Sequence, residues 1–121
     1  MEDDGEDRPD ARAEAFFEQV GGALDSFAAD AVKCVRDPED AADRYRAAYT
    51  TLSAALTTTE QLDAFELAVR DALSGLGHSI MYALDGGSED APQLLHADGT
   101  PFPGGLNEWF IAHLLDTGRI P

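Results

Sequence analysis

A change in the spacing of apolar residues at Gly77 is the feature that most restricts how this chain can fold. Over residues 62–76, apolar side chains recur at steps of three and four, the spacing of one face of an α-helix. Gly75 and Gly77 are typical of a helix end. Over residues 79–84, both alternating sets of side chains are largely apolar, as in a strand covered on both sides. We therefore predict a helix up to Gly77 and extended chain just after it.

Three helices are expected before that point. Residues 11–35 carry apolar side chains at helical spacing, and Gly21-Gly22 either divides this segment into two helices or lets another helix approach closely. Asp37-Pro38 offers a cap and a proline that suits the first turn of a second helix. The third helix begins within residues 57–61, where threonine is followed three positions later by Glu or Gln, the spacing of a capping box.

The last third of the chain is predicted to complete a small sheet and a final helix. Residues 93–96 have the composition of a short strand, Asp98-Gly99 is a tight-turn signal, and Phe102 lies between prolines that confine it to a sheet edge. Residues 106–117 return to helical spacing. The expected fold is thus α+β, with three N-terminal helices, a small antiparallel β-hairpin or three-stranded sheet, and one C-terminal helix. It forms a single domain over residues 11–121, behind a disordered acidic tail at residues 1–10.

The charge of the chain limits its partners. Twenty-four acids against eight bases give a net charge of −16, and the excess is spread along the whole sequence. Such a field repels nucleic acids and anionic lipids, so we expect neither as a partner. The acidic N-terminus is unlike a secretory signal, and no apolar run approaches the roughly 20 residues that span a bilayer, which predicts a cytoplasmic location. One alternative use of the acids is mimicry of a nucleic acid, which would need them in a regular row on one face.

The residues that most often carry chemistry are sparse. Cys34 is the single cysteine, which excludes an internal disulfide and is expected to be a small core residue. His78, His96 and His113 are separated by 18 and 17 residues, without the close pairs that place two metal ligands on one element. Ser79 and His78 are neighbours on a predicted strand, so their side chains would point to opposite faces. We therefore predict no catalytic residue, no metal site and no cofactor.

A binding site, if present, is expected at the junction of the sheet and the last helix. Asp85-Gly86-Gly87 is interpreted first as a strand end that turns, and second as a loop that binds a ligand or a partner protein. Trp109 is expected either to cover the sheet or to form an exposed aromatic contact for another chain. The candidate binding residues are His78, Asp85, Gly86, Gly87, Trp109 and His113.

The C-terminal half also resembles a known class. It carries, in order, His78-Ser79, an apolar run, Asp85-Gly86-Gly87 and the segment Gly105-Leu106-Asn107-Glu108-x-Phe110. This order resembles small bacterial proteins of unknown function in which an HS…LDGG strand precedes an LHE.F helix, and the match covers about residues 65–120. Asn107 stands where that class has a histidine, which weakens any case for a site there. The resemblance implies an architecture and no chemistry.

Three functions remain open from the sequence. The first is a protein-interaction or accessory module without catalysis, comparable to the immunity partners of bacterial toxins, that binds a protein partner or forms a homodimer. The second is a small-ligand-binding protein or enzyme with a site near His78, Asp85 and His113. The third is a mimic of nucleic acid. The first is our leading hypothesis, because the chain lacks catalytic spacing but has aromatic residues suited to anchor a partner.

Overall fold

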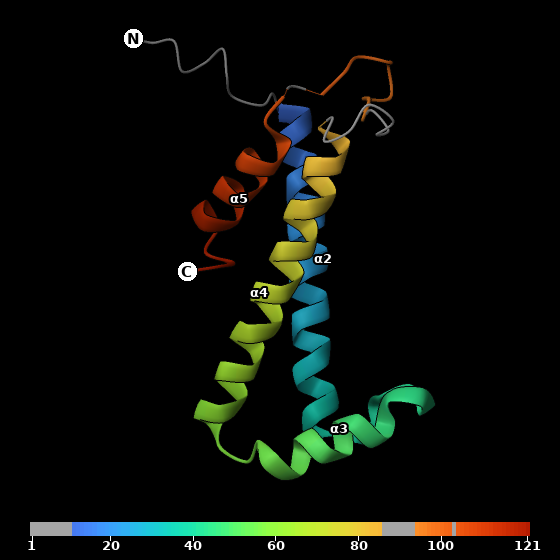
Figure 1. The fold of residues 1–121 in the computed structure, drawn as a ribbon, viewed down its shortest axis with the longest axis vertical. Coiled ribbons are helices and arrows are strands. Elements are labelled where there is room, and N and C mark those ends of the chain that lie inside the picture. The colour runs from blue at the N-terminus through green and yellow to red at the C-terminus, as the bar shows by residue number, and fades with distance from the viewer. Residues whose placement is uncertain (1–10, 86–93, 103) are drawn as a thin grey trace.

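Two long antiparallel helices form the body of the molecule. The computed structural model describes residues 11–85, 94–102 and 104–121. Its elements are α2 (Ala11–Arg36), the 3₁₀ turn η1 (Pro38–Asp40), α3 (Asp43–Ala55), α4 (Thr59–Leu84) and α5 (Leu106–Asp116). Helices α2 and α4 lie side by side, α5 lies along one end of this pair, and α3 crosses the other end (Figure 1).

The α+β prediction is wrong, because no strand occurs within the ranges that the structure describes. Residues 78–84, predicted to be a covered strand, instead continue α4 as far as Leu84. Gly77 does not end the helix. A Cβ atom at this position would lie 2.7 Å from Cε2 of Phe110, so the glycine lets the Phe110 ring lie directly against the α4 backbone. A contact with a residue 33 positions away, rather than the end of a helix, accounts for this glycine.

Only fragments of the predicted sheet are present. Leu95 and Pro101 form one isolated antiparallel bridge, which is too short to be a strand. The predicted Asp98-Gly99 turn is confirmed: Gly99 has a φ of 88°, and the backbone N–H of Thr100 donates to Asp98 Oδ1 at 2.9 Å. The turn therefore joins two irregular segments that do not form a sheet in the described part of the chain.

The first helix is continuous. Helix α2 runs through Gly21 and Gly22, which confirms helix over residues 11–35 and excludes a division into two helices. A Cβ atom on Gly21 would lie 2.8 Å from Nη1 of Arg119, whereas one on Gly22 would have no heavy atom within 4 Å. Gly21 thus lets the Arg119 guanidinium pass close to α2, and what approaches is a side chain rather than a second helix.

One of the two predicted helix starts is confirmed, and the other begins a different element. Thr58 caps α4 as a capping box: its side chain accepts from the Gln61 N–H at 3.1 Å, and Gln61 Oε1 accepts from the Thr58 N–H at 3.1 Å. Asp37 also caps, but what it caps is the short turn η1, by accepting from the Glu39 N–H at 3.3 Å. The α-helix after it begins only at Asp43. Proline at the first position therefore started a 3₁₀ turn rather than the predicted helix.

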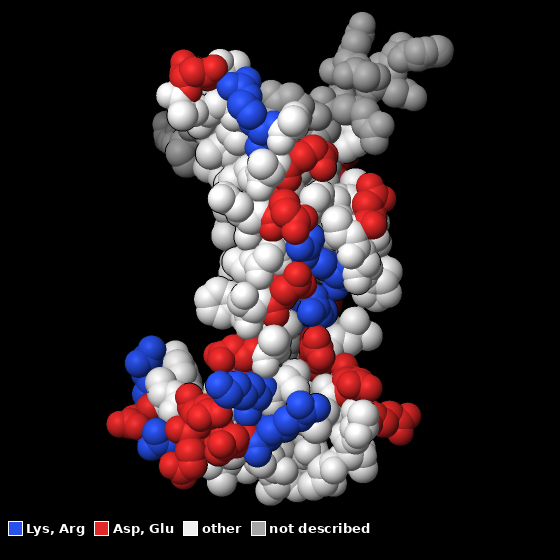
Figure 2. Space-filling model, turned by 180° about the vertical axis from the view of Figure 1, so that it is seen from behind, with Lys and Arg blue, Asp and Glu red and all other residues white. Residues whose placement is uncertain are grey.

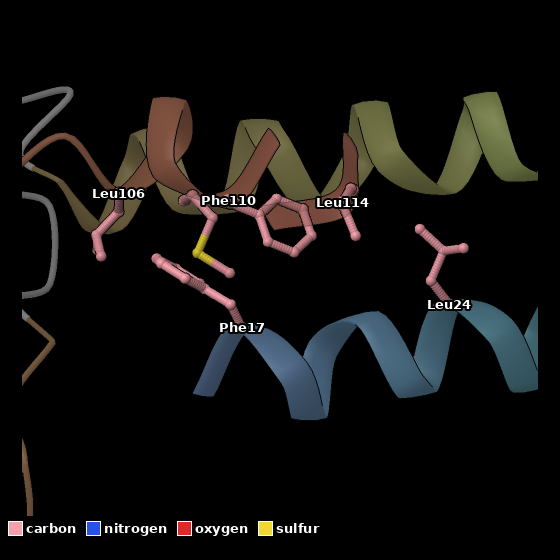
Figure 3. Packing of buried hydrophobic residues seen from close by; sticks show 6 residues of the cluster. Phe17, Leu24, Leu106, Phe110 and Leu114 are labelled. Carbon is pink, nitrogen blue, oxygen red and sulfur yellow. The ribbon is translucent and has the colours of Figure 1, made fainter. Parts of the chain in front are cut away.

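The main core lies where α2, α4 and α5 meet (Figure 3). Phe110 is fully buried between Phe17 of α2 and Gly77 of α4, and its ring centroid lies 6.0 Å from that of Phe17. Phe16 and Phe102 extend this core in an edge-to-face pair at 5.5 Å. The buried members of the cluster are Phe17, Leu24, Met81, Leu106, Phe110 and Leu114. Helix α5 is therefore fixed to one end of the helix pair by apolar contacts on one of its faces.

Candidate functional site

Asp85, a predicted binding residue, has a structural partner. It is the C-terminal cap of α4, and both of its carboxylate oxygens accept from the Gly105 N–H at 3.1 Å. Gly105 precedes α5 and has a φ of 78°, a left-handed conformation that favours glycine. The carboxylate thus joins the end of α4 to the start of α5, at the positive end of the α5 dipole. Gly86 and Gly87, the other two residues of the predicted loop, lie outside the described residues.

His113, a second predicted binding residue, lies between two carboxylates of α2. Its Nδ1 is 3.3 Å from Glu14 Oε1 and its Nε2 is 3.0 Å from Glu18 Oε1. The side chain is 10% exposed, so α5 presents this ring to α2 rather than to solvent. His113 and Asp85 therefore have different partners.

His78 and Trp109 complete the predicted set. Both side chains are half-buried, His78 on α4 and Trp109 on α5. Trp109 packs against the main core, and its Cδ1 would lie 3.4 Å from a Cβ atom on Gly105. Trp109 therefore has a packing role beside the Gly105 turn, against a helical core and not against the sheet that it was expected to cover.

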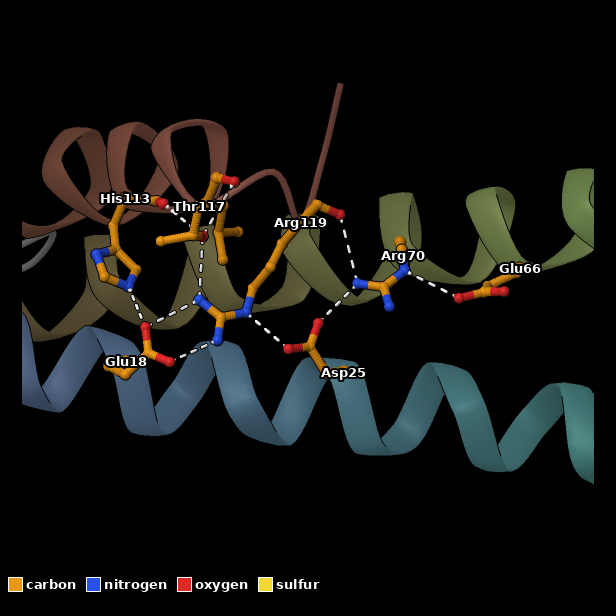
Figure 4. A network of polar contacts seen from close by, with 8 residues as sticks. Glu18, Asp25, Glu66, Arg70, His113, Thr117 and Arg119 are labelled. Atoms are coloured by element: carbon orange, nitrogen blue, oxygen red, sulfur yellow. Dashed lines mark hydrogen bonds and ion pairs between the residues drawn. The ribbon is translucent and has the colours of Figure 1, made fainter.

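A network of charged side chains, which sequence reasoning did not identify, joins the C-terminal segment to both long helices (Figure 4). Arg119 binds Glu18 through two nitrogens at 3.0 and 2.7 Å, and its Nε donates to Asp25 Oδ2 at 2.9 Å. Arg70 of α4 donates to the other oxygen of Asp25 at 2.8 Å and to Glu66 at 3.3 Å. Asp25 thus bridges the two guanidinium groups.

The ionisation of this network follows from its hydrogen bonds. Hydrogen bonds from Arg119 and then from His113 lower the pKa of Glu18 to about 2. Burial raises the pKa of Asp25, but hydrogen bonds from Arg70 and Arg119 outweigh it, so the net shift is downward. The two guanidinium groups remain charged, because these carboxylates raise the pKa of both Arg70 and Arg119. Each arginine already binds two carboxylates, so the network is built to hold the C-terminal segment and not to bind a free anion.

A cavity of about 800 Å³ opens beside this network. It lies between α2, α4 and the C-terminal segment, and Glu18, Asp25, Arg70 and Arg119 line it together with residues such as Leu67. None of the predicted binding residues lines this cavity, which leaves the predicted site without support from it. Within the described residues, no group of three or more His, Cys, Asp or Glu side chains could hold a metal ion.

Two further expectations concern Cys34 and membranes. Cys34 is buried, as expected of a small core residue, and burial followed by nearby carboxylates such as Asp30 raises the pKa of its thiol. None of the helices in the described ranges is both long enough and apolar enough to cross a bilayer.

An apolar stripe runs along the surface of α4. Seven apolar residues recur at steps of three and four along the helix, and not one of them is buried. Leu76 is 60% exposed and Ile80 is 48% exposed. The buried residues of α4 are instead Ser74, Gly77 and Met81. The stripe consists of Leu62, Phe65, Val69, Ala72, Leu76, Ile80 and Ala83.

A second apolar stripe lies on α2, on the same side of the helix pair. Asp25 and Arg70 face each other across the two antiparallel helices and so mark the network side of both. Phe27 follows Asp25 by two residues, a rotation of about 200°, and Leu76 follows Arg70 by six, a net rotation of about 240°. Both side chains therefore turn away from the network. The α2 stripe consists of Val20, which also packs against the main core, and of Ala23, Phe27 and Ala31; none of the four is fully buried.

We call the two stripes together the apolar face. Phe27, with 65% of its surface exposed, is the most exposed large apolar side chain among the described residues. Seen from behind, charged residues run down the middle of the molecule and gather at the α3 end, whereas the left margin between the charged top and the α3 end is uncharged (Figure 2). An uncharged surface of this length contrasts with the net charge of −16.

Comparison with protein-family models, with curated proteins and with solved structures finds no match to this chain. The resemblance of residues 65–120 to small bacterial proteins therefore stays a prediction, and its strand is replaced by the end of α4. Any function must be argued from the geometry of the chain itself.

Proposed function

We propose that this protein is a protein-interaction module without catalysis, and that its apolar face binds another polypeptide. The apolar face is the observation that carries this proposal. Leu76, Ile80 and Phe27 are about half exposed or more, and exposed apolar patches that are contiguous and larger than a few hundred Å² are rare on monomeric proteins unless they bind something.

The other candidate surface supports binding less well. The arginines beside the cavity each bind two carboxylates, so their charge is already compensated within the chain. Asp85 and His113 hold α5 against the long helices, and changing their contacts to receive a ligand would loosen that helix. The apolar face, in contrast, gains stability when it is covered, because burying a leucine-sized side chain contributes roughly 1.5–3 kcal/mol. An accessory role, such as that of an immunity protein, needs only such a surface.

Site-specific photocrosslinking tests this proposal. A photoreactive phenylalanine analogue is placed at Leu76, and the protein is irradiated in cells that produce it naturally. We expect a discrete crosslinked species, identified by mass spectrometry, that forms at Leu76. The matched control is Leu115, which is a leucine of similar exposure (48%) on α5, away from the apolar face. Equal crosslinking at both positions, or none at Leu76, would show that this face is not a specific binding surface.

A further inference from the structure

We infer that the apolar face is covered by a second copy of this chain, so that two α2–α4 pairs form a four-helix bundle. The inference rests on the proposed function and names the partner that the face fits. An isologous dimer places the same surface on both sides of the interface, so the surface must complement itself. A face made of two antiparallel helices meets this requirement, because a two-fold rotation brings an identical pair against it.

The pattern of side chains suits helix-on-helix packing. Along α4, the small Ala72 lies between the larger Val69 and Leu76, and the small Ala83 follows Ile80. On α2, Phe27 lies between Ala23 and Ala31 at steps of four. Large side chains of one helix can then enter the spaces above small side chains of the facing helix, which is how helices of a bundle interlock.

The size of the face is sufficient for a dimer. The α4 stripe spans 21 residue steps, or about 30 Å at the rise of an α-helix. The α2 stripe spans 11 residue steps, or about 16 Å, and each helix presents a width of about 10 Å, so the face has a flat projection of about 450 Å² on each copy. Two copies would cover about 900 Å² of flat projection, and interlocking side chains raise the buried accessible area to the roughly 1,000 Å² expected of a specific interface.

The charge of the chain predicts how this dimer responds to salt. Two copies carry −32 together, yet no residue of the apolar face is charged, so dimerisation buries no carboxylate from either stripe. Repulsion between the two acidic bodies opposes association and is screened by salt. The dimer should therefore become tighter as salt is added. A basic partner protein on the same face would show the opposite dependence, since its attraction to the acidic chain would be screened.

Light scattering and analytical ultracentrifugation of the purified full chain test the inference. At high protein concentration the mass should be twice 12.9 kDa, and the dissociation constant should fall as salt is added. Leu76→Glu places a carboxylate on each side of the interface and should raise the dissociation constant on the order of 100-fold. Leu115→Glu, on α5, should leave it unchanged. Because Leu76 is 60% exposed, the variant should keep its helical circular dichroism.

The outcomes separate this inference from the proposed function. A monomeric mass at every concentration and salt, or an unchanged dissociation constant for Leu76→Glu, overturns the dimer. If the chain is monomeric while Leu76 crosslinks to a different polypeptide, the dimer is refuted and the interaction function stands. If neither dimer nor crosslink forms, both fail. Should Leu76→Glu not fold, Phe27→Glu on α2 makes the same test from the other helix of the face.

Discussion

Gly75 and Gly77 provide the sharpest test of how α4 packs, because the same substitution should have different effects at two positions two residues apart. A Cβ atom on Gly75 would have no heavy atom within 4 Å apart from its own helix, whereas one on Gly77 would lie 2.7 Å from Cε2 of Phe110. Phe110 is fully buried in the main core and has no solvent into which its ring can move. We therefore compare Gly75→Ala with Gly77→Ala.

The expected magnitudes follow from two opposing effects. Alanine in place of glycine within a helix favours the folded state by about 1 kcal/mol. Gly75→Ala should show this gain alone. Gly77→Ala should show the same gain set against the cost of an extra methyl group in a packed core, about 1–3 kcal/mol. Gly77→Ala should therefore be less stable than Gly75→Ala by about 1–3 kcal/mol, a gap of roughly 4–12 °C in melting temperature for a chain of this size.

Urea and thermal unfolding followed by circular dichroism measure this difference, with the wild-type chain as reference. Two results would refute the reasoning. Equal stabilisation by both alanines would mean that Phe110 does not lie against Gly77. Strong destabilisation by both would mean that these glycines end the helix in a left-handed conformation, as the strand prediction for residues 78–84 required.

Two further predictions concern α2 and the start of α4. Because hydrogen bonds lower the pKa of Glu18 from 4.5 to about 2, its carboxylate stabilises the fold above about pH 4.5 and this contribution is lost as the pH falls toward 2. Over that range the melting temperature of wild type should fall more than that of Glu18→Gln, and parallel curves would contradict the network. Thr58→Ala removes a capping-box acceptor and should lower the free energy of unfolding in urea by about 1 kcal/mol. Thr57→Ala, which keeps its backbone bond to Gln61, should change it little.

The positions of the helices could be predicted where local signals exist. Threonine at position 58 with glutamine at position 61 is a local signal, and the capping box it predicts is present. Residues 78–84 give no such signal. Nearly all of them are uncharged, so their apolar spacing suits a helix as well as a strand. In the folded chain Gly77 lies against the Phe110 ring, a contact made across 33 residues that no local pattern records.

The candidate site was predictable only in part. The apolar spacing over residues 62–76 was recognised from the sequence, but its exposure was not: Leu76 lies at the surface, as does Ile80, which was placed in a covered strand. The opposite face contains the buried Ser74 and the network residue Arg70. A pattern shows that a face is apolar, but it does not show whether the same chain covers it. The pairing of Arg119 with Glu18 and Asp25 could not be predicted either, because every arginine in so acidic a chain has many possible partners.

The order of the elements has a consequence for synthesis of the chain. Phe17 emerges from the ribosome early, but its buried neighbour Phe110 is made 93 residues later. At roughly 5–20 residues per second, the apolar surface of α2 waits about 5–20 s for α5 to arrive. During that interval the nascent chain offers chaperones two apolar sides of one helix, and only one of them will later be covered by the chain itself.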